Sequence, residues 1–131
     1  MPRLLLIEDN EMNRDMLARR LTRRGYDMSL ATDGQEGLDM ATASTPDLVI
    51  LDLRLPKLDG IEVVRRLKGN PATQAIPVVV LTANALADTR RACRAAGGDA
   101  FETKPVDFKR LTVTIERLLD GRDAQDADDA L

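Results

Sequence analysis

Five polar side chains with complementary chemistry stand just past short segments with strand character in this 131-residue sequence. They are three acids, one hydroxyl and one ammonium: Glu8, Asp9, Asp52, Thr82 and Lys104. Carboxylates that converge repel one another, and their ionised forms are tolerated together when a cation is supplied. Carboxylate oxygens, without histidine or a cluster of thiolates, favour Mg²⁺ over zinc or copper. Such a metal beside a carboxylate, a hydroxyl and a lysine is suited to accepting a phosphoryl group.

The segments that must position these residues are strands. Three apolar runs, at 4–7, 48–51 and 78–81, are bounded by polar residues and partly β-branched. This pattern is typical of strands buried on both faces of a parallel sheet. The strand that contains the run 78–81 is expected to begin at Ile76. Weaker patterns predict two more strands, at 26–31 and 100–102.

Segments with helical spacing separate these strands. Asn10 can cap a helix over about residues 11–24, which Gly25 ends. We expect its apolar face to hold Met12, Met16, Leu17 and Leu21. The other helices are expected from Asp33 to before Pro46, around 61–67, around 86–96, and from Asp107 through Leu119.

The alternation of strands and helices predicts an α/β fold with five parallel strands and helices on both faces of the sheet. We expect the flavodoxin-like (βα)5 arrangement with strand order 2-1-3-4-5. Periodicity alone does not fix this order, and the family resemblance given below supports it. In an open parallel sheet the functional crevice lies beyond the carboxyl ends of the strands. The polar residues named above would therefore meet at one edge.

Composition excludes several classes of chemistry. The sequence has 19 basic and 22 acidic residues, a net charge of −3 and no histidine. Nucleophiles activated by histidine, and histidine metal ligands, are therefore excluded within this chain. The single cysteine, Cys93, cannot form an internal disulfide and is expected to be a packing residue in a reducing compartment. One Tyr, two Phe and no Trp leave too few rings for a base-stacking surface, so direct binding of nucleic acid is not expected.

The length fits one domain, which we place at residues 1–120. Residues 120–131 hold five Asp and one Arg, with almost nothing to bury. We therefore expect 121–131 to be an acidic, disordered tail, or equally a severed linker. No apolar run is long enough to span a membrane, and the amino terminus lacks the apolar region of a signal peptide. These features predict a cytoplasmic protein.

Five short segments together resemble a known family. They are Ile7-Glu8-Asp9-Asn10, Leu51-Asp52-Leu53-Arg54-Leu55-Pro56, Asp59-Gly60, Leu81-Thr82-Ala83 and Lys104-Pro105. In this combination residues 2–119 resemble the receiver domain of two-component response regulators, such as the single-domain chemotaxis and cell-division types. The resemblance implies that Asp52 is phosphorylated and helps to bind Mg²⁺, with Asp9 as a direct ligand and Glu8 as a ligand through water. The main-chain carbonyl of Arg54 would be the third protein ligand.

The same resemblance implies the remaining roles. Thr82 would hydrogen-bond the phosphoryl group and Lys104 would pair with it. Phe101 holds the position of the switch aromatic, and a plain core role for this ring is the alternative. The donor would be a sensor histidine kinase or a histidine phosphotransfer protein, and a downstream protein would read the altered surface of a monomer or weak dimer. The chain would promote its own phosphorylation and dephosphorylation without being an enzyme that acts on a separate substrate.

Two features of the arginines stay open. The first helix carries Arg14, Arg19, Arg20, Arg23 and Arg24, which form either a solvated face or a docking surface for the kinase. Arg54 lies two residues past the acceptor. We expect its side chain to lie across the mouth of the site, pairing with Glu8 or the phosphoryl oxygens and obstructing water. The alternative is a solvent-exposed charge with no kinetic role.

Three other functions are weighed against the receiver. An aspartate-nucleophile phosphatase would need an acid two residues after Asp52, where Arg54 cannot protonate a leaving group. A flavin-binding flavodoxin would need a phosphate loop after the first strand, where residues 8–11 hold three acids and neither a Gly-x-Gly-x-x-Gly motif nor a P-loop is present. The amino-terminal receiver of a longer DNA-binding regulator is the main alternative. A free-standing regulator is favoured because the sequence ends without an effector.

Overall fold

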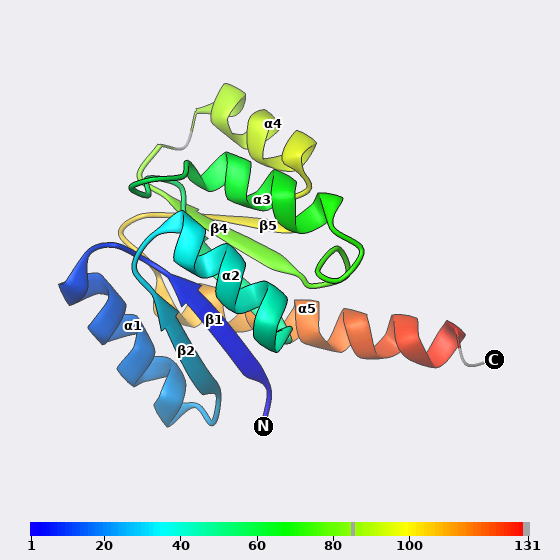
Figure 1. The fold of residues 1–131 in the computed structure, drawn as a ribbon. Helices are drawn as coiled ribbons and strands as arrows, with labels where there is room; N and C mark the ends of the chain where they lie inside the picture. Colours follow the sequence, from blue (N-terminus) through cyan, green and yellow to red (C-terminus); the bar gives the residue numbers. More distant parts are fainter. Residues whose placement is uncertain (85, 130–131) are drawn as a thin grey trace.

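The structure is a computed structural model that describes residues 1–84 and 86–129, with side-chain surroundings as far as Gly121. Strands and helices alternate along these ranges (Figure 1). In chain order they are β1 (Arg3–Ile7), α1 (Glu11–Arg23), β2 (Asp27–Ala31), α2 (Gly34–Ser44), β3 (Leu48–Asp52), α3 (Gly60–Gly69), β4 (Val78–Thr82), α4 (Ala87–Ala96), β5 (Ala100–Thr103) and α5 (Phe108–Asp129). Apart from the end of α5, each lies within about two residues of the range that the sequence predicts.

The sheet has the predicted topology. All neighbouring strands are parallel, and their order is β2-β1-β3-β4-β5. Helices α2, α3 and α4 pack on one face, and α1 and α5 pack on the other. The chain first winds from β1 outward to β2 and then crosses back to β3, so the winding direction changes between β1 and β3. Ligand sites of doubly wound sheets lie at this switch point.

The central strands are buried on both faces. In β1, Leu5 and Ile7 pack in the layer of α2, α3 and α4, whereas Leu4 and Leu6 pack in the layer of α1 and α5. Successive side chains of a strand point to opposite faces, so one continuous apolar run fills both layers. Cys93 is buried in the first of these layers, which confirms its predicted packing role.

The first helix begins as predicted, but its apolar face differs. Asn10 Oδ1 accepts a hydrogen bond of 3.0 Å from the backbone N–H of Asn13 and caps α1. Leu17 and Leu21 are buried, whereas Met12 is 83% and Met16 is 44% exposed. The prediction that the two methionines share the buried face is therefore wrong. At about 100° per residue, Met12 lies about 180° around the helix from Leu21.

The last helix is longer than the sequence suggests. Asp107 Oδ1 accepts from the backbone N–H of Arg110 at the predicted start, and Leu111 and Ile115 are fully buried. Helix α5 extends to Asp129 (Figure 1), and the disordered character expected of the acidic tail stays a prediction. Extending a helix that has already formed adds one hydrogen bond per residue without a new nucleus, and the segment contains no proline. Residues 130–131 lie outside the described residues.

Candidate functional site

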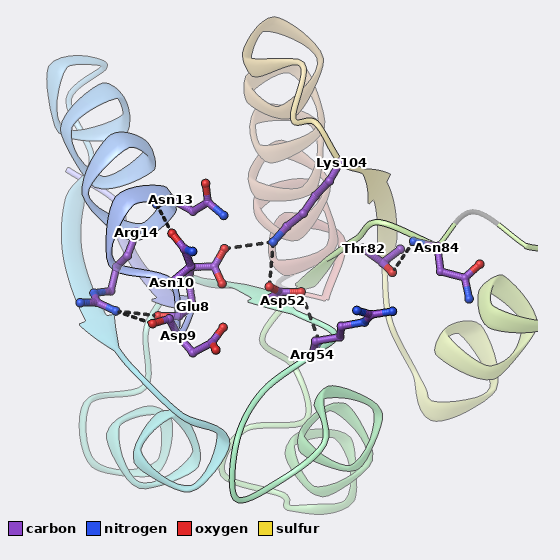
Figure 2. A network of polar contacts seen from close by, with 10 residues as sticks. All are labelled: Glu8, Asp9, Asn10, Asn13, Arg14, Asp52, Arg54, Thr82, Asn84 and Lys104. Carbon is purple, nitrogen blue, oxygen red and sulfur yellow. Dashed lines mark hydrogen bonds and ion pairs between the residues drawn. The ribbon is translucent and has the colours of Figure 1, made fainter.

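The five residues singled out for their chemistry lie at the carboxyl edge of the sheet. Asp52 and Thr82 are the last residues of β3 and β4, Glu8 and Asp9 follow β1, and Lys104 follows β5. Figure 2 shows them side by side, with the three acids and the ammonium facing one another. The convergence follows from the parallel register, which aligns the ends of neighbouring strands.

Lys104 joins two buried acids. Its Nζ donates to Asp52 Oδ2 at 2.7 Å and to Glu8 Oε1 at 3.1 Å. Glu8 is fully buried and Asp52 is 7% exposed, so both charges are held in a poorly solvated place. The backbone N–H of Lys104 donates to the carbonyl of Thr82 at 2.8 Å and fixes the loop that carries the lysine. The peptide bond from Lys104 to Pro105 is cis.

The acids form a suitable site for a divalent cation. One carboxylate oxygen from each of Glu8, Asp9 and Asp52 lies within 4.8 Å of the others. Lys104 supplies one positive charge against these three acids, so two negative charges are left over when all three acids are ionised. Glu8 Oε2 is buried and, within the described part of the chain, has no hydrogen-bond partner. A buried polar atom without a partner is costly, and a cation or its bound water would satisfy it. Oxygen donors of this kind fit Mg²⁺.

The two charged groups in the interior of the site have shifted pKa values. Burial, followed by the neighbouring Asp52, raises the pKa of Glu8 from 4.5 to about 7, although Lys104 opposes the shift. Burial lowers the pKa of Lys104, but hydrogen bonds and charge attraction from Asp52 and Glu8 outweigh it, so the net shift is upward. Lys104 therefore stays an ammonium across the physiological range. Glu8 is held in the site at a cost that a bound cation would relieve.

Arg54 contributes its backbone to the site. Its N–H donates to Asp52 Oδ1 at 3.2 Å, so both oxygens of Asp52 are hydrogen-bonded. The Arg54 side chain is exposed and extends toward the side of Thr82 and Asn84, away from Glu8 (Figure 2). The expected pairing of Arg54 with Glu8 is therefore not formed. The other predicted contact, between the Arg54 side chain and a phosphoryl group, stays a prediction.

The hydroxyl and the aromatic ring lie in different surroundings. Thr82 is buried at the end of β4, where its Oγ1 accepts from the backbone N–H of Asn84 at 3.0 Å. Phe101 lies in β5 and packs against the core layer of α2, α3 and α4. The guanidinium of Arg90 stands 5.2 Å from the centre of its ring. The structure thus places Thr82 at the carboxyl edge of the sheet and Phe101 beside Arg90 of α4.

The sequence matches the family model of the response regulator receiver domain over residues 4–116. The chain belongs to this family. Response regulator MprA of Mycobacterium tuberculosis is 36% identical to the receiver over 129 residues, which are 98% of this chain and 55% of that protein. The DNA-binding dual master transcriptional regulator RpaA of Synechocystis is 38% identical over 119 residues, which are 91% of this chain and 49% of that protein. The receiver therefore spans about half the length of these curated relatives.

A solved receiver shows the same fold with a metal. The receiver domain of sensor histidine kinase PA1611 from Pseudomonas aeruginosa PAO1 is 31% identical, with a TM-score of 0.84, and the match covers 90% of this chain and 97% of that one. That crystal structure has a magnesium ion coordinated in its active-site cleft. The present receiver has a cluster of three acids, Glu8, Asp9 and Asp52, whose spacing could hold a metal ion.

Two residues of the receiver site, Arg14 and Gly60, have structural roles that the sequence did not predict. Arg14 Nη1 donates to the carbonyls of Glu8 and Asp9, at 3.0 and 3.4 Å, and ties α1 to the loop that presents both acids. A Cβ at Gly60 would lie 2.8 Å from the carbonyl oxygen of Asp52, so only glycine fits there. The Asp59-Gly60 motif signals this position. Nothing in the sequence separates Arg14 from the other arginines of α1.

Helix α1 of the receiver uses two further arginines to contact α5. Arg20 stands over the ring of Phe108, and Arg24 pairs with Glu116 at 3.3 Å. Arg19 and Arg23 are exposed, so the kinase-docking role of this face stays a hypothesis. Among the residues that the structure describes, no helix is long and apolar enough to cross a membrane.

Proposed function

We propose that this receiver accepts a phosphoryl group on Asp52 from a phosphohistidine of a sensor histidine kinase or a histidine phosphotransfer protein. The observation that carries the proposal is the position of Asp52. Its carboxylate lies at the open edge of the sheet between the Lys104 ammonium and the Arg54 N–H, with Glu8 and Asp9 beside it. Because the chain has no histidine, the phosphorylated imidazole must come from the partner.

The proposed transfer is a displacement at phosphorus. An oxygen of the Asp52 carboxylate attacks the phosphorus, the P–N bond to the imidazole breaks, and the departing ring nitrogen takes a proton. The Lys104 ammonium offsets the negative charge of the phosphoryl oxygens, and the buried Thr82 hydroxyl can donate to one of them. Hydrolysis of the phosphoaspartate ends the signal: a water oxygen attacks the same phosphorus. The bond to Asp52 then breaks and yields inorganic phosphate and a free carboxylate.

The acids of the cleft would hold Mg²⁺. The proposed ligands are Asp9 directly, Glu8 through a water, the Asp52 carboxylate and the main-chain carbonyl of Arg54. When bound, the ion would supply positive charge to the phosphoryl oxygens. The orphaned Glu8 Oε2 and the three clustered carboxylates support this assignment.

The proposed output is a change of surface. A phosphoryl group adds about −1.5 to −2 charges at pH 7. Thr82 lies at the end of β4, and Phe101 lies in the neighbouring strand β5. A movement of Thr82 toward the new anion would therefore alter the packing of Phe101 against α4. We place this signalling module in the cytoplasm, as a phosphoacceptor and not a turnover enzyme. A receiver within a longer DNA-binding regulator is the second candidate, because MprA and RpaA extend beyond the matched region.

The test is intact-mass measurement after exposure to phosphoramidate, a small phosphodonor. We expect the wild type to gain one phosphoryl group in Mg²⁺ and none in excess chelator. Asp52→Asn should gain none, whereas Asp47→Asn, a matched change at the opposite edge of the sheet before β3, should label like the wild type. Undiminished labelling of Asp52→Asn would contradict the proposal, and so would normal labelling in chelator.

A further inference from the structure

Of the three clustered acids, Asp9 is held in the cleft differently from the other two. Lys104 donates to the carboxylates of Glu8 and Asp52, and both of these acids are buried. Asp9 is exposed, and among the described residues its carboxylate has no hydrogen bond and no ion pair (Figure 2). The place of this carboxylate in the cleft therefore depends on the backbone at Asp9, from which the side chain extends.

Arg14 of α1 holds that backbone. Its backbone N–H donates to the carbonyl of Asn10 at 2.9 Å, in the first turn of the helix. Its Nη1 donates to the carbonyls of Glu8 and Asp9, at 3.0 and 3.4 Å (Figure 2). The N–H of Glu8 donates to the carbonyl of Ala31 at 3.0 Å and anchors the same turn to β2. One residue of α1 thus donates to three successive carbonyls of the turn that leaves β1.

The two carbonyls bonded by Arg14 Nη1 restrict the conformation of Asp9. A peptide unit is planar, so a hydrogen bond that holds a carbonyl also holds the whole plane to which it belongs. The Glu8 carbonyl belongs to the plane before the Asp9 Cα, and the Asp9 carbonyl belongs to the plane after it. Holding both planes restricts φ and ψ of Asp9, and with them the direction of its Cα–Cβ bond. The Arg14 guanidinium therefore acts on the Asp9 carboxylate through the backbone.

We infer that Arg14 is a positioning residue for Asp9 and thereby sets the affinity of the cleft for its divalent cation. The inference rests on the proposed function, in which Asp9 is a direct ligand of Mg²⁺. Loss of a group that orients a metal ligand typically weakens metal binding by about 10- to 100-fold. The positive charge of Arg14 acts in the opposite direction, because a guanidinium near the cleft repels a bound cation. Positioning and charge therefore predict changes of opposite sign when Arg14 is removed.

The probe for the test is Mn²⁺, which takes oxygen ligands as Mg²⁺ does and whose free form is measured by electron paramagnetic resonance. The full chain is titrated with Mn²⁺, and Mg²⁺ should displace the bound ion. Arg14→Ala should bind Mn²⁺ about tenfold more weakly than the wild type. Arg14→Lys keeps the charge on a side chain that is one atom shorter and should recover only part of the affinity. The matched control Arg19→Ala loses an exposed, solvent-screened charge of α1 and should stay within about twofold.

A double-mutant cycle separates positioning of Asp9 from a general loss of stability. Because Arg14 acts through Asp9, Arg14→Ala should change the Mn²⁺ affinity of an Asp9→Ala protein by less than about twofold. A urea titration without metal checks that each variant is folded under the conditions of the binding measurement. Arg14→Lys takes the place of Arg14→Ala in the same cycle should the alanine variant fail to fold.

Equal Mn²⁺ binding by Arg14→Ala and the wild type would overturn the inference, and so would tighter binding by Arg14→Ala, which charge alone predicts. An undiminished loss of affinity in the Asp9→Ala background would also overturn it, because Arg14 would then act on the cleft as a whole. If the wild type is phosphorylated on Asp52 and Arg14 has no effect on Mn²⁺ binding, only the inference fails. A wild type that neither binds Mn²⁺ nor gains a phosphoryl group would contradict the proposed function as well.

Discussion

Replacing Glu8 by glutamine should stabilise the metal-free receiver at pH 8. Glu8 is fully buried, and its pKa rises from 4.5 to about 7 because of burial and the neighbouring Asp52. A raised pKa means that the folded state holds the proton more tightly than the unfolded state. The stability contributed by this group is therefore fully present below about pH 4.5 and is lost as the pH rises through about 7. The difference corresponds to about 3 kcal/mol at pH 8.

Glutamine keeps the size of Glu8 and its acceptor oxygen but carries no charge to be desolvated. It weakens the hydrogen bond from Lys104 by about 1 kcal/mol, because the acceptor is no longer ionised. The net gain is then about 2 kcal/mol, or about 6 °C in the midpoint of thermal unfolding for a chain of this length. Far-UV circular dichroism in chelator, at pH 5 and pH 8, measures this midpoint. At pH 5 the wild type and Glu8→Gln should differ little.

Two comparisons complete this test. Glu11→Gln, at an exposed position at the start of α1, removes an acid without relieving burial and should leave the pH dependence unchanged. Adding Mg²⁺ at pH 8 should stabilise the wild type more than Glu8→Gln, because a ligand stabilises the state that binds it better. A Glu8→Gln protein that is less stable than the wild type at pH 8 in chelator would refute the reasoning. The reasoning would also fail if the midpoint of unfolding changed between pH 5 and pH 8 by the same amount in Glu8→Gln and in the wild type.

Three more results are expected. Lys104→Ala leaves Glu8 and Asp52 without their shared cation. It should lower the free energy of unfolding in chelator by about 2 kcal/mol, measured in a urea titration. An unchanged midpoint would show that the pairing contributes little. Phosphorylation should alter amide exchange in α4 and β5 more than in α2, and a largest change within 33–44 would contradict the switch through Thr82 and Phe101. Arg54→Ala should lose label from its purified phosphoprotein faster than the wild type at equal Mg²⁺, whereas equal or slower loss would leave Arg54 a solvated charge.

The convergence of the site could be predicted from the sequence because each part depends on a local pattern. Short apolar runs with β-branched residues become central parallel strands, and the residue after each run must then lie at the carboxyl edge. Asp52, Thr82 and Lys104 are positioned in this way. The strand order needed the family resemblance, because hydrophobic periodicity describes faces and not neighbours.

The parts that the sequence did not predict depend on three-dimensional packing. The predicted apolar face of α1 wrongly included Met12. Its apolar side chain suggested burial, but its position around the helix axis is opposite that of Leu21. Arg14 bonds two carbonyls that only the folded β1 to α1 turn brings within reach. No sequence motif specifies the direction of the Arg54 side chain, which extends toward the side of Thr82 and Asn84 (Figure 2). Gly60 belongs to the Asp59-Gly60 motif, but its close approach to Asp52 depends on the three-dimensional fold.

The position of the phosphoryl group is the most direct test of the central claim. An acyl phosphate is reduced by borohydride to the corresponding alcohol, so a phosphorylated aspartate becomes homoserine, which tandem mass spectrometry locates in a peptide. After incubation with a phosphodonor and Mg²⁺, homoserine should be found at position 52 and should be absent when Mg²⁺ is chelated. Homoserine at Asp9 or another aspartate instead of Asp52, or none at all under conditions in which the protein remains folded, would contradict the account.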